Sequence, residues 1–182
     1  MRKKLARPKI AHFGAFDHDS YGDLIFPIIA EHFLPDFELI HVSPTGNPTA
    51  WPDARKSISI AEAISKTDWD GVLVGGGDIV QSGDFTTKLW NRTPLLSFGS
   101  LTSIWCGASL LAAKLNIPCV WNCPGVPLEI PNNLKSLATS AIHSVDYICL
   151  RDNASAQRIN KLLMRPASVV PDTALDISSL WP

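Results

Sequence analysis

The sequence predicts an α/β domain with a parallel sheet of about six strands and helices on both of its faces. Three observations predict this fold class. Apolar segments of strand length alternate with segments of helical periodicity along nearly the whole chain. The strand segments are continuous apolar runs, which is typical of strands that are buried on both faces. Turn-forming residues separate the segments, and no internal repeat or low-complexity stretch interrupts them.

Each predicted strand is a short apolar run that ends in turn-forming or polar residues. The strands are expected at residues 10–16, 37–44, 69–78, 117–127, 145–152 and 167–172. The helices are expected at residues 24–34, 59–66, 100–115, 132–144 and 153–163. Residues 46–57 are rich in turn formers and predict a loop, whereas residues 81–94 show no clear period and are expected to cross the top of the sheet. The last ten residues show no clear element.

Composition and charge narrow the class of protein. The 182 residues fit a single domain spanning 1–182, and a hydrophobic fraction of 46% with 18% charged residues is typical of a globular protein. The 16 basic and 17 acidic side chains leave a net charge of -1, which argues against nucleic-acid binding. The basic start MRKKLARPK resembles a solvated tail and no apolar stretch has the length of a membrane span, so a cytoplasmic location is expected. The four cysteines lack zinc-ribbon or redox spacing, and we expect them to be buried thiols.

Polar or glycine-bearing segments follow five of the predicted strands. They are DHDSYGD (17–23), GGGD (75–78), CPGVP (123–127), RDNAS (151–155) and PDTALD (171–176). Because the carboxyl ends of parallel strands lie along one edge of a sheet, these segments should converge there. Backbone N–H groups at such a place, together with helix N-termini, favour the binding of anions.

Each of these residues also has a structural interpretation. Gly75 to Gly77 would suit a tight turn, and Asp23 or Asp152 would suit a helix cap. Arg151 would suit an ion pair with a neighbouring carboxylate, Ser155 would suit the first turn of a helix, and His18 would suit a solvated turn. Three histidines that fall in predicted strands or a helix are expected to be structural: His12, His32 and His41. The sequence contains no G-x-G-x-x-G after its first strand, no Walker lysine motif and no nucleophile elbow.

The order of these motifs resembles that of the polysaccharide pyruvyl transferase family. The matching segments are SYGD (20–23), VLVGGGDIVQ (72–81), IPCVWNCPGVP (117–127), YICLRDNAS (147–155) and VVPDTALD (169–176). The resemblance implies the first Rossmann-like half of a two-domain fold like that of the GT-B glycosyltransferases. It also implies transfer of a pyruvyl group from phosphoenolpyruvate to a sugar of a cell-surface polysaccharide, forming a cyclic ketal. Two features depart from the family: its members are usually about twice this long, and CPG stands where many have G-x-G-P.

The resemblance and the chemistry together give a set of candidate site residues. Asp23, Asp78 and His18 are the candidates for proton transfer, since ketal formation at an enol ether needs an acid and a base. The candidates for substrate binding are Ser20, Gly22, Gly75, Gly76, Gly77, Arg151, Asp152 and Ser155. Phosphoenolpyruvate and a glycan acceptor are the expected partners, with no cofactor, metal or nucleic acid and with a homo-oligomer possible. The alternatives are a non-catalytic sugar- or nucleotide-binding module and a GT-B glycosyltransferase.

Overall fold

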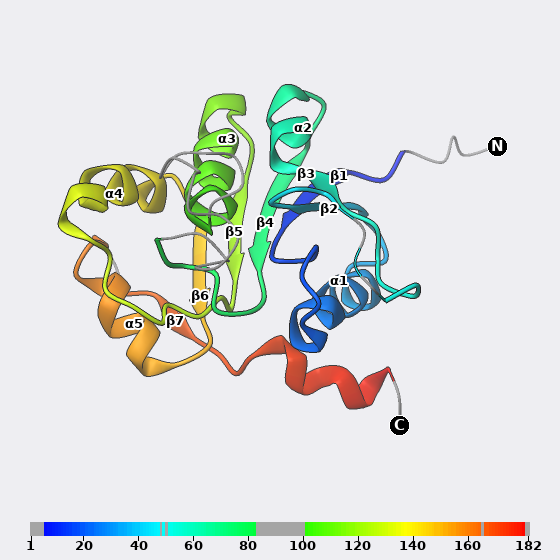
Figure 1. Ribbon diagram of the computed structural model, residues 1–182. Helices are drawn as coiled ribbons and strands as arrows, with labels where there is room; N and C mark the ends of the chain where they lie inside the picture. Colours follow the sequence, from blue (N-terminus) through cyan, green and yellow to red (C-terminus); the bar gives the residue numbers. More distant parts are fainter. Residues whose placement is uncertain (1–5, 48, 50, 83–100, 165, 181–182) are drawn as a thin grey trace.

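The fold is a seven-stranded parallel sheet between helices (Figure 1). The computed structural model describes residues 6–47, 49, 51–82, 101–164 and 166–180. The strand order is β3-β2-β1-β4-β5-β6-β7, and every neighbouring pair is parallel. The strands are β1 Lys9–Phe13, β2 Glu38–Ser43, β3 Ile58–Ser59, β4 Gly71–Gly75, β5 Cys119–Asn122, β6 Tyr147–Leu150 and β7 Ser168–Val169.

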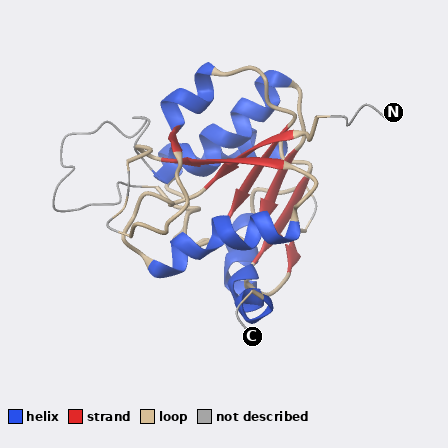
Figure 2. Cartoon of the chain, turned by 90° about the vertical axis from the view of Figure 1, so that its right-hand side faces the viewer, coloured by secondary structure: helices blue, strands red, loops and turns tan. Residues whose placement is uncertain are grey.

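The helices lie on both faces of this sheet, as the sequence predicts (Figure 2). The α-helices are α1 Tyr21–Phe33, α2 Ile60–Ser65, α3 Ala108–Leu115, α4 Lys135–His143 and α5 Asn153–Asn160. The shorter helical segments are η1 Ser103–Gly107, which is a π-helical turn leading into α3, η2 Asn132–Leu134 and η3 Thr173–Ser179. Connections between parallel strands are right-handed, so α1 and α3, which connect strands in opposite directions along the sheet, cover opposite faces.

The strand count differs from the expected six because β3 has only two residues. Ile58 and Ser59 pair with Val42 and Ser43 at the edge of the sheet. Ser59 also caps α2, where its hydroxyl accepts a hydrogen bond of 3.1 Å from the backbone of Glu62. The sequence assigns Ser59 to a helix and Ile58 to no element, because both residues stand between a turn-rich stretch and a helical pattern. The segment predicted to cross the sheet, 81–94, lies mostly outside the described residues.

The apolar residues of the central strands form the core. Phe13 of β1, Val74 of β4 and Trp121 of β5 are fully buried between the two helical layers. Trp121 meets Trp105 edge to face with ring centroids 5.9 Å apart, and its indole N–H donates to the hydroxyl of Ser109 at 3.0 Å. Burial of each such side chain contributes about 1.5–3 kcal/mol, so the sheet is a rigid base for the loops at its edge.

The strand order reverses between β1 and β4, and this is the place where a ligand crevice is expected in a sheet of this kind. From β1 the chain builds outward to β2 and β3, and it then returns to the other side of β1 to continue with β4. At such a reversal the loops leave the two strands toward opposite faces, and ligands bind beyond the carboxyl ends. The SYGD segment leads from β1 into α1, and GGGD ends β4, so both motifs flank this crevice.

The C-terminal segment returns across the same edge of the sheet (Figure 1). After β7 the chain runs back toward α1, and η3 packs against that helix. Asp172 starts η3, where its side chain accepts a hydrogen bond of 2.9 Å from the backbone N–H of Ala174. The sequence predicts Asp172 as the last residue of a strand and leaves the following residues without an element, whereas in the structure Asp172 is the N-cap of η3. Among the described residues, no helix is long and apolar enough to cross a membrane.

Candidate functional site

The three glycines that end β4 are buried against other parts of the chain. A side chain at Gly76 would collide with the ring of Phe26 of α1, and one at Gly75 would press on Asn122 of β5. A side chain at Gly77 would collide with the carboxylate of Asp23. Gly76 and Gly77 also have positive φ angles of 85° and 71°, a conformation that favours glycine. Packing and turn geometry account for all three glycines, and their role in holding a sugar or phosphate stays a prediction.

Asp23 stands in the first turn of α1 and points toward the glycine turn. Burial is the main cause that raises the pKa of its carboxyl, and the nearby charge of Asp78 adds to the effect. A hydrogen bond with the side chain of Ser20 and the charges of His18 and Arg151 act in the opposite direction. The pKa of the Asp23 carboxyl therefore lies above that of an ordinary aspartate.

The other residues of the SYGD segment shape the start of α1. Ser20 is the N-cap residue, and its backbone oxygen accepts hydrogen bonds from Asp23 and Leu24 at 3.0 and 3.1 Å. Gly22 is exposed, and a side chain added there would meet no atom within 4 Å. The surface beside the first turn of α1 is therefore open.

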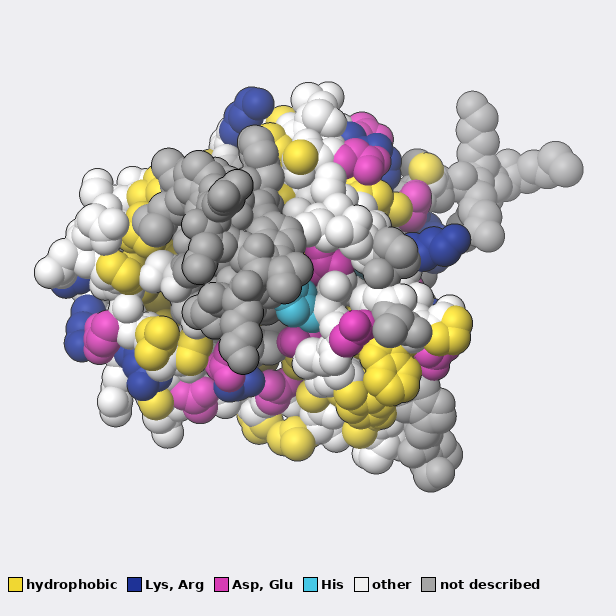
Figure 3. All heavy atoms as spheres, viewed as in Figure 1, with side chains coloured by type: hydrophobic (Ala, Val, Ile, Leu, Met, Phe, Trp, Pro, Cys, Tyr) yellow, Lys and Arg dark blue, Asp and Glu magenta, His cyan; other side chains and the backbone are white. Residues whose placement is uncertain are grey.

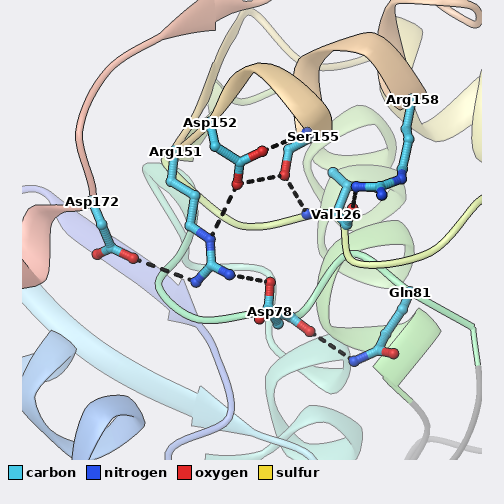
Figure 4. A network of polar contacts seen from close by, with 8 residues as sticks. All are labelled: Asp78, Gln81, Val126, Arg151, Asp152, Ser155, Arg158 and Asp172. Carbon is cyan, nitrogen blue, oxygen red and sulfur yellow. Dashed lines mark hydrogen bonds and ion pairs between the residues drawn. The ribbon is translucent and has the colours of Figure 1, made fainter.

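Arg151 connects three carboxylates that come from three separate loops (Figure 4). Its guanidinium donates to Asp78 after β4, and it lies 3.5 Å from Asp152 and 3.6 Å from Asp172. The side chain of Arg151 is only 28% exposed. Burial works to lower its pKa, but the carboxylates, Asp78 first, outweigh burial and raise it. Arg151 is therefore a permanent cation, already surrounded by negative charge.

Gly125, in the CPGVP segment after β5, makes room for this ion pair. A side chain at Gly125 would collide with Asp78 and with the guanidinium of Arg151. Its backbone N–H donates to Gly77 at 2.9 Å, and its carbonyl accepts from Val80 at 3.1 Å, so the loops after β4 and β5 are fastened together. Sequence reasoning named the Pro-Gly pair but did not include Gly125 or Asp172 among the site residues.

Ser155 and Asp152 hold the start of α5 and the loop beside it. The backbone N–H of Ser155 donates to Asp152 at 2.7 Å, and its hydroxyl donates to the other carboxylate oxygen at 3.0 Å. The same hydroxyl accepts from the backbone N–H of Val126 at 2.9 Å, and Ser155 is 2% exposed. The structural alternative is therefore observed for both residues: Asp152 is a helix cap and Ser155 is an internal link. Their contact with a substrate stays a prediction.

We expect the stabilising effect of the Asp152 cap to disappear in acid. Hydrogen bonds from Ser155 lower the pKa of Asp152 in the folded protein, so its stabilisation is present above the ordinary pKa of 3.8 and is lost as pH falls through the lowered value. Asp152→Ala should lower the free energy of unfolding by about 1 kcal/mol at pH 7. The difference in free energy of unfolding between Asp152→Ala and the parent, measured by urea unfolding, should become smaller as the pH falls below about 5. A difference that is the same at every pH would contradict the cap assignment.

His18 is held at the crevice by a buried carboxylate. Its Nδ1 lies 3.2 Å from Asp17, and Asp17 also accepts hydrogen bonds from the backbone and hydroxyl of Thr45 at 2.7 and 2.6 Å. Burial tends to raise the pKa of Asp17, but its hydrogen bonds to His18 and Thr45 outweigh this and lower it. Asp17 is therefore a fixed negative charge that orients the imidazole. Sequence reasoning did not select Asp17 or Thr45, because their pairing depends on β2 lying beside β1.

The structure brings Asp23, Asp78, Arg151 and His18 to one edge of the sheet, as the sequence predicts. Charged side chains and a histidine gather on this face of the molecule (Figure 3). In contrast, His12 and His41 lie inside the protein with their Nδ1 atoms 3.1 Å apart. No group of three or more metal-binding side chains occurs within the described part of the chain.

A sequence model of the family described as polysaccharide pyruvyl transferase matches residues 21–182. This match covers most of the chain. The chain belongs to the polysaccharide pyruvyl transferase family. Asp23, Asp78, Arg151 and Asp172 fall within the residues matched to the polysaccharide pyruvyl transferases, whereas His18 and Ser20 precede them.

Comparisons with individual proteins add little to this family assignment. No curated protein matches the chain. One matching solved structure is a DJ-1 superfamily protein from Agrobacterium tumefaciens, with 15% identity and a TM-score of 0.44 over 95% of this chain and 89% of the other. That similarity is too low to support any statement about the polysaccharide pyruvyl transferase site.

Proposed function

We propose that this protein takes part in transferring a pyruvyl group from phosphoenolpyruvate to a sugar of a polysaccharide, forming a ketal. Membership of the family supports pyruvyl transfer in general. The observation that carries the finer proposal is the environment of the Asp23 carboxyl. This residue is a carboxyl group with a raised pKa beside Asp78 and Arg151, at the reversal of strand order. Such a group suits the protonation of a carbon atom, which is the demanding step in the use of an enol ether.

The proposed reaction balances without a metal or a redox step. Protonation of the vinyl CH₂ of phosphoenolpyruvate makes a methyl group and leaves a cation at the adjacent carbon. One sugar hydroxyl attacks that carbon and loses its proton to a base. Departure of phosphate then lets a second hydroxyl attack in the same way. Of the two protons that the hydroxyls lose, one is taken up by the departing phosphate and the other restores the acid. The products are the cyclic ketal and inorganic phosphate, and acid and base each return to their starting state.

We assign the acid role to Asp23 and the base role to His18. The carboxylate of Asp17 lies against Nδ1 of His18 and orients the imidazole, and an imidazole beside a carboxylate is suited to accept a proton. Asp78 is the candidate for binding a sugar hydroxyl, because its side chain is 48% exposed while one oxygen is fixed by Arg151. Asp23 and His18 are among the sequence candidates for proton transfer, whereas Asp78, the third candidate for that role, is assigned here to binding.

The three carboxylates around Arg151 bear on where phosphoenolpyruvate binds. Three carboxylates face one guanidinium, so an incoming phosphate would have to displace a carboxylate to bind it. We therefore propose that this chain supplies proton transfer and acceptor contacts. The anionic groups of phosphoenolpyruvate would bind mainly to a second half, as in a GT-B architecture of which residues 1–182 form the N-terminal half, or to a second copy of the chain. We place the reaction in the cytoplasm, where phosphoenolpyruvate is made.

Phosphate release tests this proposal. The full-length protein is incubated with phosphoenolpyruvate and a panel of bacterial and fungal cell-surface glycans, and inorganic phosphate is measured with and without glycan. We expect glycan-dependent release together with a mass gain of a pyruvyl ketal on the glycan. Consumption of phosphoenolpyruvate at the same rate without any glycan, or no release with any of them, would contradict it.

The charge balance at Arg151 also favours one alternative, a module that binds a neutral sugar without catalysis. Such a module would bind oligosaccharides and release no phosphate from phosphoenolpyruvate. A GT-B glycosyltransferase would instead release a nucleotide from a nucleotide sugar. Measurement of all three products in the same assay separates the proposed reaction from both alternatives.

A further inference from the structure

Two exposed aromatic side chains frame a hollow beside the start of α1. Tyr21 is 67% exposed and Trp51, from the loop between β2 and β3, is 51% exposed. Both line a hollow of about 330 Å³, which we call the Tyr21–Trp51 hollow. Its floor is an apolar face of α1, and one carboxylate stands in its wall. The remaining lining residues are Leu24, Ile25, Ile28, Asp53 and Ala54.

Trp51 also lines a second hollow of about 260 Å³ in the same loop. Two cations, Arg55 and Lys56, contribute to it together with Asn47, Thr49 and Ser57. Trp51 therefore stands between an apolar surface and a set of hydrogen-bonding groups. A pyranose ring has the same division, because its C–H groups form an apolar face and its hydroxyls form a polar rim. Large exposed aromatic rings with polar groups nearby are suited to such amphipathic ligands.

The Tyr21–Trp51 hollow is continuous in the chain with the candidate site. Tyr21 directly precedes Gly22, where a side chain would meet no atom within 4 Å. Asp23, the proposed acid, follows Gly22 and points toward Gly77. The Tyr21–Trp51 hollow and the proposed acid therefore lie at the same end of α1, within its first turn.

We propose that the Tyr21–Trp51 hollow binds a sugar residue of the acceptor glycan, next to the sugar that receives the pyruvyl group. This proposal rests on the proposed function, since it assigns the acceptor side of that reaction. The glycan's apolar face would stack on Trp51 and Tyr21, while Asp53 accepts hydrogen bonds from its hydroxyls. An apolar peptide would contact the apolar face of α1 but would leave the carboxylate of Asp53 without a hydrogen-bond donor. A carbohydrate can contact both the apolar residues and the carboxylate.

Direct binding tests the hollow independently of catalysis. The protein is labelled with 5-fluorotryptophan, and the ¹⁹F resonance of Trp51 is assigned by its loss in Trp51→Phe. Lactose, cellobiose and chitobiose are then added to millimolar concentrations. We expect at least one of them to shift the Trp51 resonance, while the buried Trp105 and Trp121 stay unchanged. No shift with any of the three, or an equal shift with an apolar peptide or with phosphoenolpyruvate alone, would overturn the assignment.

Variants give the energetic test. Tyr21→Ala and Trp51→Ala should each weaken disaccharide binding about tenfold, whereas Phe33→Ala, which removes another exposed ring of α1, should not change it. Tyr21→Ala is followed by the ¹⁹F titration, and Trp51→Ala, which lacks the reporter, is followed by calorimetry. Equal weakening in Phe33→Ala would show a general effect on α1 and would count against the hollow.

The two proposals fail in different ways. In the phosphate-release assay Trp51→Ala should raise the KM for the glycan and leave the KM for phosphoenolpyruvate unchanged. A Trp51 shift without any phosphate release would remove the proposed reaction and keep the hollow as a sugar site. Normal release with an unchanged glycan KM in Trp51→Ala would remove the hollow and keep the reaction.

Discussion

Asp23→Asn should lower glycan-dependent phosphate release about 10²- to 10⁴-fold, the usual cost of losing a general acid. The asparagine side chain keeps the size and much of the hydrogen bonding of Asp23 but has no proton to give to the vinyl carbon. The measurement is kcat for phosphate release from phosphoenolpyruvate, with the KM of both substrates recorded. Because the loss is in proton transfer, kcat should fall far more than either KM changes.

The stability of the same variant separates catalysis from folding. Since the folded-state pKa of Asp23 is raised, the carboxyl favours folding at low pH and loses that effect as pH rises through the raised value. At pH 7 the variant should therefore have a melting temperature equal to or above that of the parent. Asp36→Asn, at an exposed position after α1, is the control and should leave both rate and stability unchanged. A large loss of stability in Asp23→Asn would mean that this carboxylate is structural.

Gly76→Ala should produce the largest loss of stability, about 3 kcal/mol in the free energy of unfolding. Two causes add together here. The φ angle of 85° is strained for a residue with a side chain, at about 1–2 kcal/mol, and the methyl group would collide with Phe26 and force α1 outward. Urea unfolding, followed by circular dichroism, measures the change.

Gly22→Ala is the matched control for this prediction. Gly22 lies in the first turn of α1, and its added methyl group would meet no atom within 4 Å. Alanine there should be neutral or should stabilise the protein by up to about 1 kcal/mol. Combining Gly76→Ala with Phe26→Ala should remove the collision but not the backbone strain. Equal stability of Gly76→Ala and Gly22→Ala would show that the packing of β4 against α1 has been misassigned.

The sequence alone predicted the parallel α/β sheet and the edge where polar loops gather. Continuous apolar runs such as GVLVG indicate burial on both faces, and parallel strands necessarily end on the same side. This reasoning correctly placed Asp23, Asp78 and Arg151 together. It missed β3, because Ile58 and Ser59 stand between a turn-rich stretch and a helical pattern. It missed η3, because TALDISSLWP lacks a clear helical pattern.

The tertiary structure decided the partners of the residues that the sequence selected. The space beside Gly76 belongs to Phe26, which is fifty positions earlier in the chain, and the guanidinium of Arg151 faces Asp78 and Asp172 from two other loops. The local sequence pattern indicates whether a residue is buried and in which element it lies, because the periods of helices and strands relate residues that are close in sequence. Which side chains meet at the edge depends on strand order and on the returning C-terminal segment, and both arise from contacts between residues far apart in sequence.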